Sequence, residues 1–173
     1  AFFPAYPSQE RRRVCHLSEP VGMSPLGIAQ TRKKPLQWTK VDDLAQYKVG
    51  VVEAYANEDR FDQLMQQGII KTSSSETDVD NLISLAKGKV DAAVIDSQVF
   101  DWLLRNEPRL KPYRNSLQMN QRLLVTWPLY VCFRRDSEGA AQRDQFNAGL
   151  STLREKMLAT SAPAEKPASP KRR

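Results

Sequence analysis

The feature that most constrains this chain is the repeated order of strand and helix patterns over residues 48–104. The apolar run at residues 90–95 is typical of a strand buried in a parallel sheet, where both faces are covered. Apolar residues at helical spacing precede and follow this run. Residues 48–53 and 69–72 are two further strand-like runs. Strands that alternate with helices predict right-handed crossovers and a parallel sheet covered by helices.

The expected helices have residues that start and stop them. Asn57 is the predicted N-cap of the first helix, and Gly68 ends it. Thr77 or Asp78 caps the second helix, and Gly88 is its stop. The helices are therefore expected to be short and to follow each strand closely.

Two strand-like segments, residues 23–31 and 123–133, bracket the alternating region. Such a bracket is what a lobe inserted into another lobe requires, because the chain must go out and come back. A helix of about 20 residues is expected after the second segment, because its apolar residues recur at helical spacing and predict a core-facing stripe. The stripe consists of Phe146, Leu150, Leu153 and Met157.

The formal net charge of +6 raises the question of nucleic-acid binding, and the location of the charge answers it. Residues 161–173 hold four of the basic side chains and only Glu165 as an acid, and they contain too little apolar surface to fold. The remaining chain mixes both signs along its helices. We therefore expect a solvated surface with a disordered basic tail, and no nucleic-acid partner.

The cysteines and the single histidine limit metal and thiol chemistry. Cys15 and Cys132 lie far apart in strand-like contexts, and with His16 they are too few for a usual zinc site. A disulfide is conceivable in an oxidising compartment, but buried free thiols are the expected state. No metal, no cofactor and no catalytic residue is predicted. No stretch reaches the ~20 apolar residues that cross a bilayer.

One string of residues resembles a known family. Leu85-Ala-Lys-Gly-Lys-Val-Asp-Ala-Ala-Val-Ile-Asp96, preceded by Lys48-Val-Gly-Val-Val, resembles lobe two of the type II periplasmic solute-binding proteins. It is most similar to the polar amino-acid substrate-binding family of ABC transporters, bacterial extracellular solute-binding family 3. Ser8-Gln-Glu-Arg11, with Ser18 seven residues after the arginine, is similar to that family's carboxylate-binding turn.

The resemblance implies an α/β fold of the type II periplasmic-binding-protein kind, with a complete lobe two and a partial lobe one. Residues 1–30 would be the partial lobe one, with the carboxylate-binding turn and a crossing strand. Residues 31–122 would be lobe two, and residues 123–160 the return strand and C-terminal helix of lobe one. The N-terminal half of lobe one is expected to be missing, so the segments outside lobe two should expose apolar surface.

The resemblance also implies a binding site with two charges. A free amino acid presents a carboxylate and an ammonium, which need a bidentate cation and an anion. Arg11 matches the family's carboxylate-binding arginine, and Ser8 matches a hydroxyl residue of the same turn. Asp96 falls where the family places the ammonium-binding carboxylate, at the end of a strand, where ligands of α/β sheets gather. Asp96 could equally be an N-cap, and Arg11 could belong to a solvated basic run.

The sequence departs from the family's pattern around this site. Many amino-acid binders have glycine and then hydroxyl residues after the Val-Gly-Val strand, and here Ala56 replaces the hydroxyl. The helix opening at Asn57 could still offer backbone N–H groups to an anion. Tyr6 and Tyr55 could flank the ligand, or could be packing residues. These departures place the α-amino-acid identity of the ligand in question.

The function implied is capture of an amino acid or a similar small polar solute by hinge closure, as the solute-binding component of an ABC-type uptake system. Its partners would be the solute and a membrane permease, and its location the periplasm, after removal of a signal peptide that this sequence does not contain. The chain is not expected to be an enzyme. Three alternatives stay open: a cyclohexadienyl dehydratase-like enzyme on the same fold, a sensory ligand-binding domain, and a module that binds no ligand.

Overall fold

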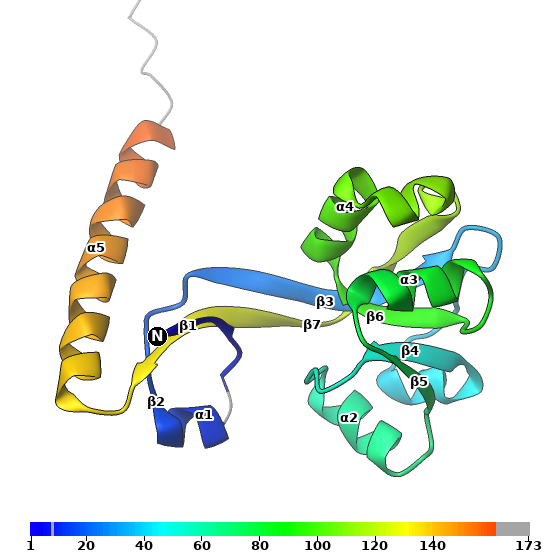
Figure 1. Cartoon of the computed structure of the whole chain (residues 1–173), viewed down its shortest axis with the longest axis horizontal. Helices are drawn as coiled ribbons and strands as arrows, with labels where there is room; N and C mark the ends of the chain where they lie inside the picture. The colour runs from blue at the N-terminus through cyan, green and yellow to red at the C-terminus, as the bar shows by residue number, and fades with distance from the viewer. Residues whose placement is uncertain (8, 162–173) are drawn as a thin grey trace, which may run out of the picture. The chain divides into compact units, whose positions relative to one another are not determined.

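A computed structural model describes residues 1–7 and 9–161 of the chain (Figure 1). The chain divides into two compact units. Unit 1 contains the stretch up to Gly22 and the stretch from Pro128 onward, and unit 2 is Met23–Trp127. The tail was expected over residues 161–173; Ser161 is the last residue of a helix, and residues 162–173 lie outside the described residues.

The sheet of unit 2 confirms the alternating pattern of the sequence. Its strands lie in the order β7-β3-β6-β4-β5. β4 is parallel to both β5 and β6, whereas β3 is antiparallel to β6. The predicted parallel sheet is therefore confirmed for three strands within a mixed sheet. The bounds are β3 (Gly22–Thr31), β4 (Lys48–Val52), β5 (Lys71–Ser75), β6 (Ala92–Asp96) and β7 (Leu117–Arg134).

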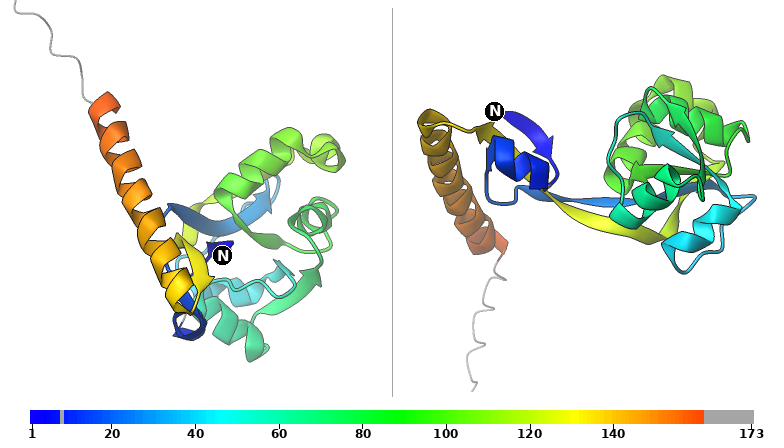
Figure 2. Two further views of the ribbon diagram at one scale, coloured as in Figure 1. Left: turned by 60° about the vertical axis from the view of Figure 1, so that its left-hand side comes forward. Right: turned by 90° about the horizontal axis from the view of Figure 1, so that it is seen from below.

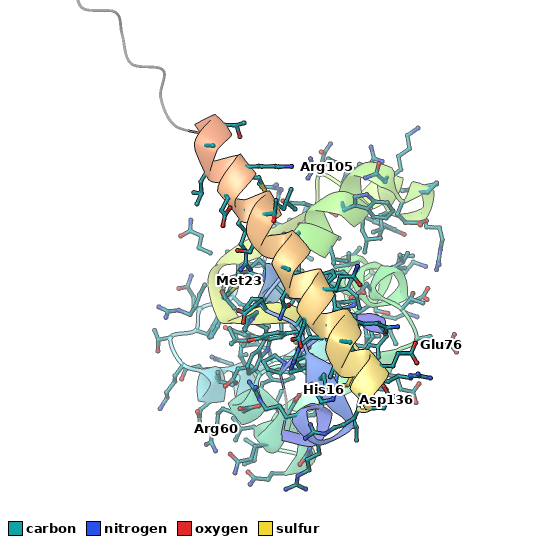
Figure 3. The ribbon with its side chains drawn as sticks, turned by 90° about the vertical axis from the view of Figure 1, so that its left-hand side faces the viewer. His16, Met23, Arg60, Glu76, Arg105 and Asp136 are labelled. Carbon is teal, nitrogen blue, oxygen red and sulfur yellow. A yellow bond between two sulfur atoms is a disulfide. The ribbon has the colours of Figure 1, made fainter. Side chains whose placement is uncertain are left out.

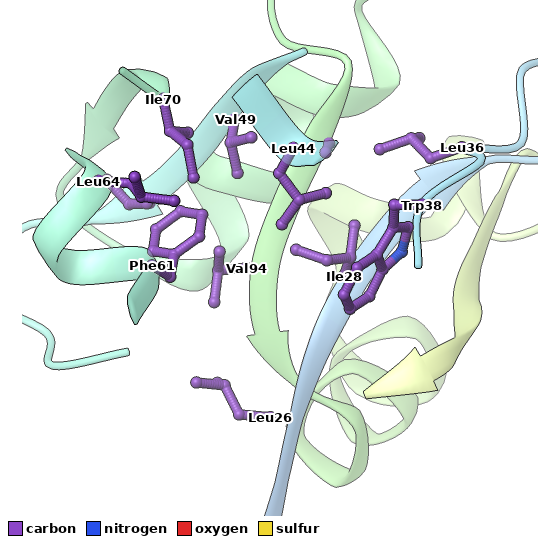
Figure 4. Packing of buried hydrophobic residues seen from close by; sticks show 12 residues of the cluster. Leu26, Ile28, Leu36, Trp38, Leu44, Val49, Phe61, Leu64, Ile70 and Val94 are labelled. Atoms are coloured by element: carbon purple, nitrogen blue, oxygen red, sulfur yellow. The ribbon is translucent and has the colours of Figure 1, made fainter. Parts of the chain in front are cut away.

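Helices cover both faces of this sheet (Figures 1 and 2). The helices are η1 (Val41–Gln46), α2 (Asp59–Gln66), α3 (Asp78–Ala86), α4 (Ser97–Asn106) and η2 (Pro108–Tyr113). On one face, η1 and α2 pack Leu44 and Phe61 against the sheet, in the cluster drawn in Figure 4. On the other face, α3 and α4 contribute Leu82 and Phe100 to a second cluster. This arrangement buries both sides of β6.

The ends of the helices follow the predictions with one correction. Thr77 caps α3 by accepting from Asp80 N, and Gly68 and Gly88 adopt positive φ angles of 69° and 70° just after α2 and α3. The cap of α2 is Glu58, whose side chain accepts from Phe61 N, so the prediction of Asn57 as the N-cap is wrong by one residue. Both side chains can accept a backbone N–H, and the amide of Asn57 is used elsewhere, as described below.

Unit 1 is built on the last residues of β7. The strands β1 (Phe2–Ala5) and β2 (Cys15–Leu17) both pair antiparallel with β7. The helix α1 (Gln9–Val14) lies between them in sequence, and α5 (Ser137–Ser161) follows β7. β7 and β3 are the two strands through which the chain passes from one unit to the other.

The apolar stripe of α5 is not buried, which corrects the expectation of a core-facing stripe. Leu153 is 54% exposed and Met157 is 60% exposed. Among the described residues, Phe146 makes a ring contact with Phe133 of the preceding strand, with 5.7 Å between the ring centroids. Figure 3 draws α5 nearest the viewer, with side chains projecting along the helix. The exposed side chains of α5 agree with the expectation that the segments outside lobe two expose apolar surface.

Cys15 and Cys132 form a disulfide, so the expectation of two free thiols is wrong. β2 pairs with β7 so that Leu17 faces Cys132, and the two cysteine Cα atoms lie 5.3 Å apart, a distance that a disulfide spans. Both sulfurs are buried with Ala5 in the small core of unit 1. From the sequence alone the disulfide is the less favoured alternative, because 117 positions separate the two residues and their proximity depends on the fold.

We expect reduction of this disulfide, or the double variant Cys15→Ser/Cys132→Ser, to lower the free energy of unfolding of unit 1 by about 2–5 kcal/mol. The reason is that the bridge closes a long loop in the unfolded chain, which is where such bridges contribute most. Hydrogen exchange measured with and without reductant should show faster exchange in β1 and β2, and unchanged exchange in β4 and β6. Equal protection of β2 in both states would contradict the expectation.

Candidate functional site

Asp96 lies at the carboxyl end of β6, and three hydrogen bonds hold its carboxylate in place. Its Oδ1 accepts from Gln98 N at 2.7 Å and from Val99 N at 3.1 Å, so Asp96 is the N-cap of α4. Its Oδ2 accepts a short hydrogen bond from Ser24 Oγ. A carboxylate oxygen can accept more than one hydrogen bond, so Oδ2 keeps a lone pair for a ligand donor. The N-cap and ligand roles are therefore compatible.

Ser24 is a site residue that sequence reasoning missed. It lies near the start of β3, is 2% exposed, and reaches Asp96 because β3 and β6 are antiparallel neighbours with Leu26 facing Asp96. Ser24 could have been identified only from the strand order, which places the start of β3 beside the end of β6. Knowledge of that order needs the fold.

Asp78 is a second carboxylate at the same edge of the sheet. It is the first residue of α3, which follows β5, and it is half-buried. Burial, and after it the negative charge of Asp96, raise the pKa of Asp78 above its ordinary value. No described residue donates a hydrogen bond to the Asp78 side chain, and neither Asp78 nor Asp96 has an ion-pair partner among the described residues. We call Asp78 and Asp96 the strand-end pair.

The loop after β4 places the predicted residues Tyr55, Ala56 and Asn57 beyond the end of a neighbouring strand. Tyr55 and Ala56 are exposed. Asn57 is buried, and its Nδ2 and backbone N–H donate to the two oxygens of Asp62 at 2.8 and 2.9 Å. Its carbonyl accepts from Trp127 Nε1 at 3.0 Å. Asn57 therefore fixes this loop, and its side-chain and backbone N–H groups are already used as hydrogen-bond donors.

The same loop contains a strained backbone position. Ala54 has a φ of 61°, and the turn is closed by Tyr55 N donating to Val52 O at 3.3 Å. A left-handed conformation costs a residue with a Cβ about 1–2 kcal/mol, and glycine adopts it without that cost. Glycine is the residue that the family pattern has after this strand.

Two predicted residues lie in unit 1, and a third lies outside the described residues. Arg11 belongs to α1, and its guanidinium carbon is 5.7 Å from the ring centroid of Phe2. Tyr6 follows β1 and is half-buried. Ser8 is not among the described residues. No group of three or more metal-binding side chains occurs within residues 1–7 and 9–161. In the same part of the chain, none of the helices combines the length and apolarity needed to cross a bilayer.

Comparisons with known proteins support the fold. No family model and no curated protein matches the chain. A solved histidine kinase sensor domain with similarity to periplasmic binding proteins superposes with a TM-score of 0.71 and 21% identity, over 90% of this chain and 64% of its own. An amino acid ABC transporter substrate-binding protein from Streptococcus pneumoniae, bound to L-arginine, gives 0.67 and 20%, over 88% and 60%.

The arginine-bound form of truncated ArgBP from T. maritima gives a TM-score of 0.67 at 19% identity, over 86% of this chain and 64% of its own. This chain thus has the α/β fold of the periplasmic binding proteins and spans about 60–64% of the length of these structures. These neighbours are two binding proteins and one sensor domain with similarity to periplasmic binding proteins.

We expect Ala54→Gly to raise the free energy of unfolding by about 0.5–1 kcal/mol, because it removes the strain of the positive φ angle and costs some backbone entropy. Ala56→Gly is the matched control two residues away, where no positive φ demands glycine, and it should leave stability unchanged or lower it. Urea unfolding followed by circular dichroism measures both. A loss of stability in Ala54→Gly as large as that in Ala56→Gly would refute the strain.

The raised pKa of Asp78 predicts a pH-dependent stability. A carboxyl whose pKa is higher in the folded chain than in the unfolded chain favours folding when protonated, so its ionisation costs stability as the pH rises through the folded pKa. Asp78→Asn should therefore gain stability relative to the parent chain as the pH rises from about 3 to about 7, around the ordinary Asp pKa. Urea unfolding across this range, with the exposed Asp101→Asn as control, tests it. A difference in the free energy of unfolding between Asp78→Asn and the parent chain that does not change with pH would contradict the prediction.

Proposed function

We propose that this chain is part of a solute-binding protein of an ABC-type uptake system, and that it captures an amino acid or similar small polar solute by hinge closure. The observation that carries the proposal is the strand-end pair. Asp96 is fixed by three hydrogen bonds, Asp78 is half-buried beside it, and neither has a cationic partner among the described residues. Two neighbouring carboxylates without a cationic partner attract an ammonium or guanidinium group of a ligand.

The location of the pair suits a ligand as well. In α/β sheets, ligands bind outside the carboxyl ends of the strands. β4, β5 and β6 are parallel, so their carboxyl ends share one edge. Tyr55 lies in the loop after β4, Asp78 begins the helix after β5, and Asp96 ends β6. Arg11 would bind the carboxylate of the solute, as the resemblance implies, with Ser8 and Tyr6 in the same turn. Tyr55, Ala56 and Asn57 would adjoin the solute from the loop after β4.

Two further facts support the class of solute and its compartment. The neighbours from S. pneumoniae and T. maritima were solved with arginine bound, and arginine carries a positive charge that two carboxylates would neutralise. The Cys15–Cys132 disulfide forms in oxidising surroundings, of which the bacterial periplasm is one. The proposed partners are thus a small polar solute, with a cationic amino acid first among the candidates, and a membrane permease.

A sensory ligand-binding domain is the second candidate function, because a histidine kinase sensor domain superposes with a TM-score of 0.71 over 90% of the chain. Both functions share the solute-binding step and differ in the protein that reads the bound state. Site-specific cross-linking of the solute-loaded protein in its native cells would distinguish them. Attachment to a permease supports transport, and attachment to a kinase supports sensing.

We expect thermal-shift screening of the whole chain against amino acids, small carboxylates and amines to find a cationic solute, and calorimetry to give its Kd. Asp96→Asn should raise that Kd about tenfold or more, because it removes the anion, while asparagine keeps the N-cap of α4. Arg11→Gln should raise it for solutes that carry a carboxylate. Asp101→Asn, an exposed aspartate of the same helix, is the matched control and should leave Kd unchanged.

The outcomes that contradict the proposal are specific. A solute whose Kd is the same in Asp96→Asn as in the parent chain would remove Asp96 from the site. A solute without a positive charge that binds most tightly would remove the role of the strand-end pair. Chemical turnover of the bound solute, followed by chromatography, would favour an enzyme on this fold.

A further inference from the structure

A pocket that is separate from the strand-end pair lies wholly within unit 2. It has a volume of about 470 Å³ and is formed where β3 ends and β7 begins. Strand β3 contributes Gln30, near its last residue, whereas Ser24 and its contact with Asp96 lie near its first. The pocket is lined by Gln30, the segment Pro35–Trp38 and the β7 residues Gln118–Arg122. We call it the β3/β7 pocket.

The side-chain acceptors in the lining of this pocket already accept hydrogen bonds from the protein. The Oε1 of Gln30 accepts from Leu36 N and from Asn120 Nδ2, both at 2.9 Å. The Oδ1 of Asn120 accepts from Arg122 N at 3.0 Å. Gln118 Oε1 accepts from Arg32 at 3.1 Å. These bonds hold the lining in place, and both lone pairs of Gln30 Oε1 are used.

Among the described residues, one buried donor of the lining, Trp38 Nε1, has no acceptor, and Gln30 Nε2 is an unpaired donor that is not itself a buried atom. Trp38 is 9% exposed, and its Nε1 has no hydrogen-bond partner among the described residues. Gln30 is 4% exposed, and no described residue accepts from its Nε2. In Figure 4 the indole nitrogen of Trp38 lies on the edge of the ring that faces away from Ile28 and the hydrophobic cluster. A buried donor without an acceptor is unfavourable, so a ligand oxygen at Trp38 Nε1 would be favoured.

The charge around the pocket has one sign. Residues 30–38 and 118–122 contain Arg32, Lys33, Lys34 and Arg122, and no acidic residue. The guanidinium carbon of Arg122 lies 5.7 Å from the ring centroid of Trp38. A guanidinium only donates, so Arg122 cannot satisfy the indole N–H, and it lies over the face of the ring. A stacked contact of this kind is weak at an exposed site, so Arg122 can turn aside for a ligand.

We propose that the β3/β7 pocket binds a small organic carboxylate, with Trp38 Nε1 and Gln30 Nε2 as donors and Arg122 as the charge partner. Unpaired donors and uniform positive charge select an anion, and planar carboxylates suit a guanidinium. The apolar lining by Pro35, Leu36 and Met119 and the volume of the pocket fit an organic acid better than a bare inorganic ion. This site is separate from the solute site proposed above and does not depend on it.

The test follows the indole N–H groups of the ¹⁵N-labelled whole chain by NMR. The chain has three tryptophans, and Trp38→Phe assigns the resonance of Trp38. Sodium succinate and sodium acetate are titrated at constant pH and ionic strength, with sodium phosphate and sodium chloride as comparison salts. We expect a saturable shift of the Trp38 indole proton with succinate, and none for Trp102, which is 60% exposed and reports unspecific salt effects.

Variants make the test specific to the pocket. Arg122→Gln keeps a polar side chain at an exposed position and should raise the apparent Kd for succinate about fivefold or more. Arg105→Gln, an exposed arginine of α4 that does not line the pocket, should leave it unchanged. No Trp38 shift with either carboxylate, the same shift with chloride, a response to phosphate alone, or an unchanged Kd in Arg122→Gln would each overturn the proposal. Solute binding that depends on Asp96 is measured separately and fails or succeeds independently.

Discussion

The burial of β6 on both of its faces is the constraint on which unit 2 depends. Alternate residues of this short strand point to opposite sides, so Ala92 and Val94 join the cluster under η1 and α2, while Ala93 and Ile95 join the cluster under α3 and α4. Its backbone is paired with β3 on one side and β4 on the other. A strand enclosed in this way cannot shift register, because a shift by one residue would exchange the two sets of side chains.

This constraint also explains how much of unit 2 was predictable. The strands β4 and β6 and the helices between and after them were expected close to their observed places, because each has an apolar period and residues that start or stop it. β5 was less accurate: the apolar residues Ile69 and Ile70 suggested a strand from 69 to 72, and the observed strand is the polar Lys71–Ser75. At the edge of a sheet, backbone pairing with β4 decides the strand, and side-chain pattern does not.

The features that were not predicted depend on contacts between residues distant in sequence. The Cys15–Cys132 disulfide needs β2 to pair with the end of β7, and the link from Ser24 to Asp96 needs β3 beside β6. The stripe on α5 has the period of a buried helix, but its burial depends on what packs against it, which a period does not contain. Of the candidate site, the sequence indicated Asp96 and missed both Ser24 and Asp78 as members, because only the fold brings the three together.

The disulfide joins two residues of unit 1 that lie before and after the whole of unit 2 in the sequence. The chain from Cys15 to Cys132, which contains the whole of unit 2, is therefore closed into a covalent ring. A protease that cuts one peptide bond anywhere within this ring makes a nick but releases no fragment, since both pieces stay attached through sulfur. For a protein exposed to extracytoplasmic proteases, such closure would let a nicked molecule keep all of its parts together.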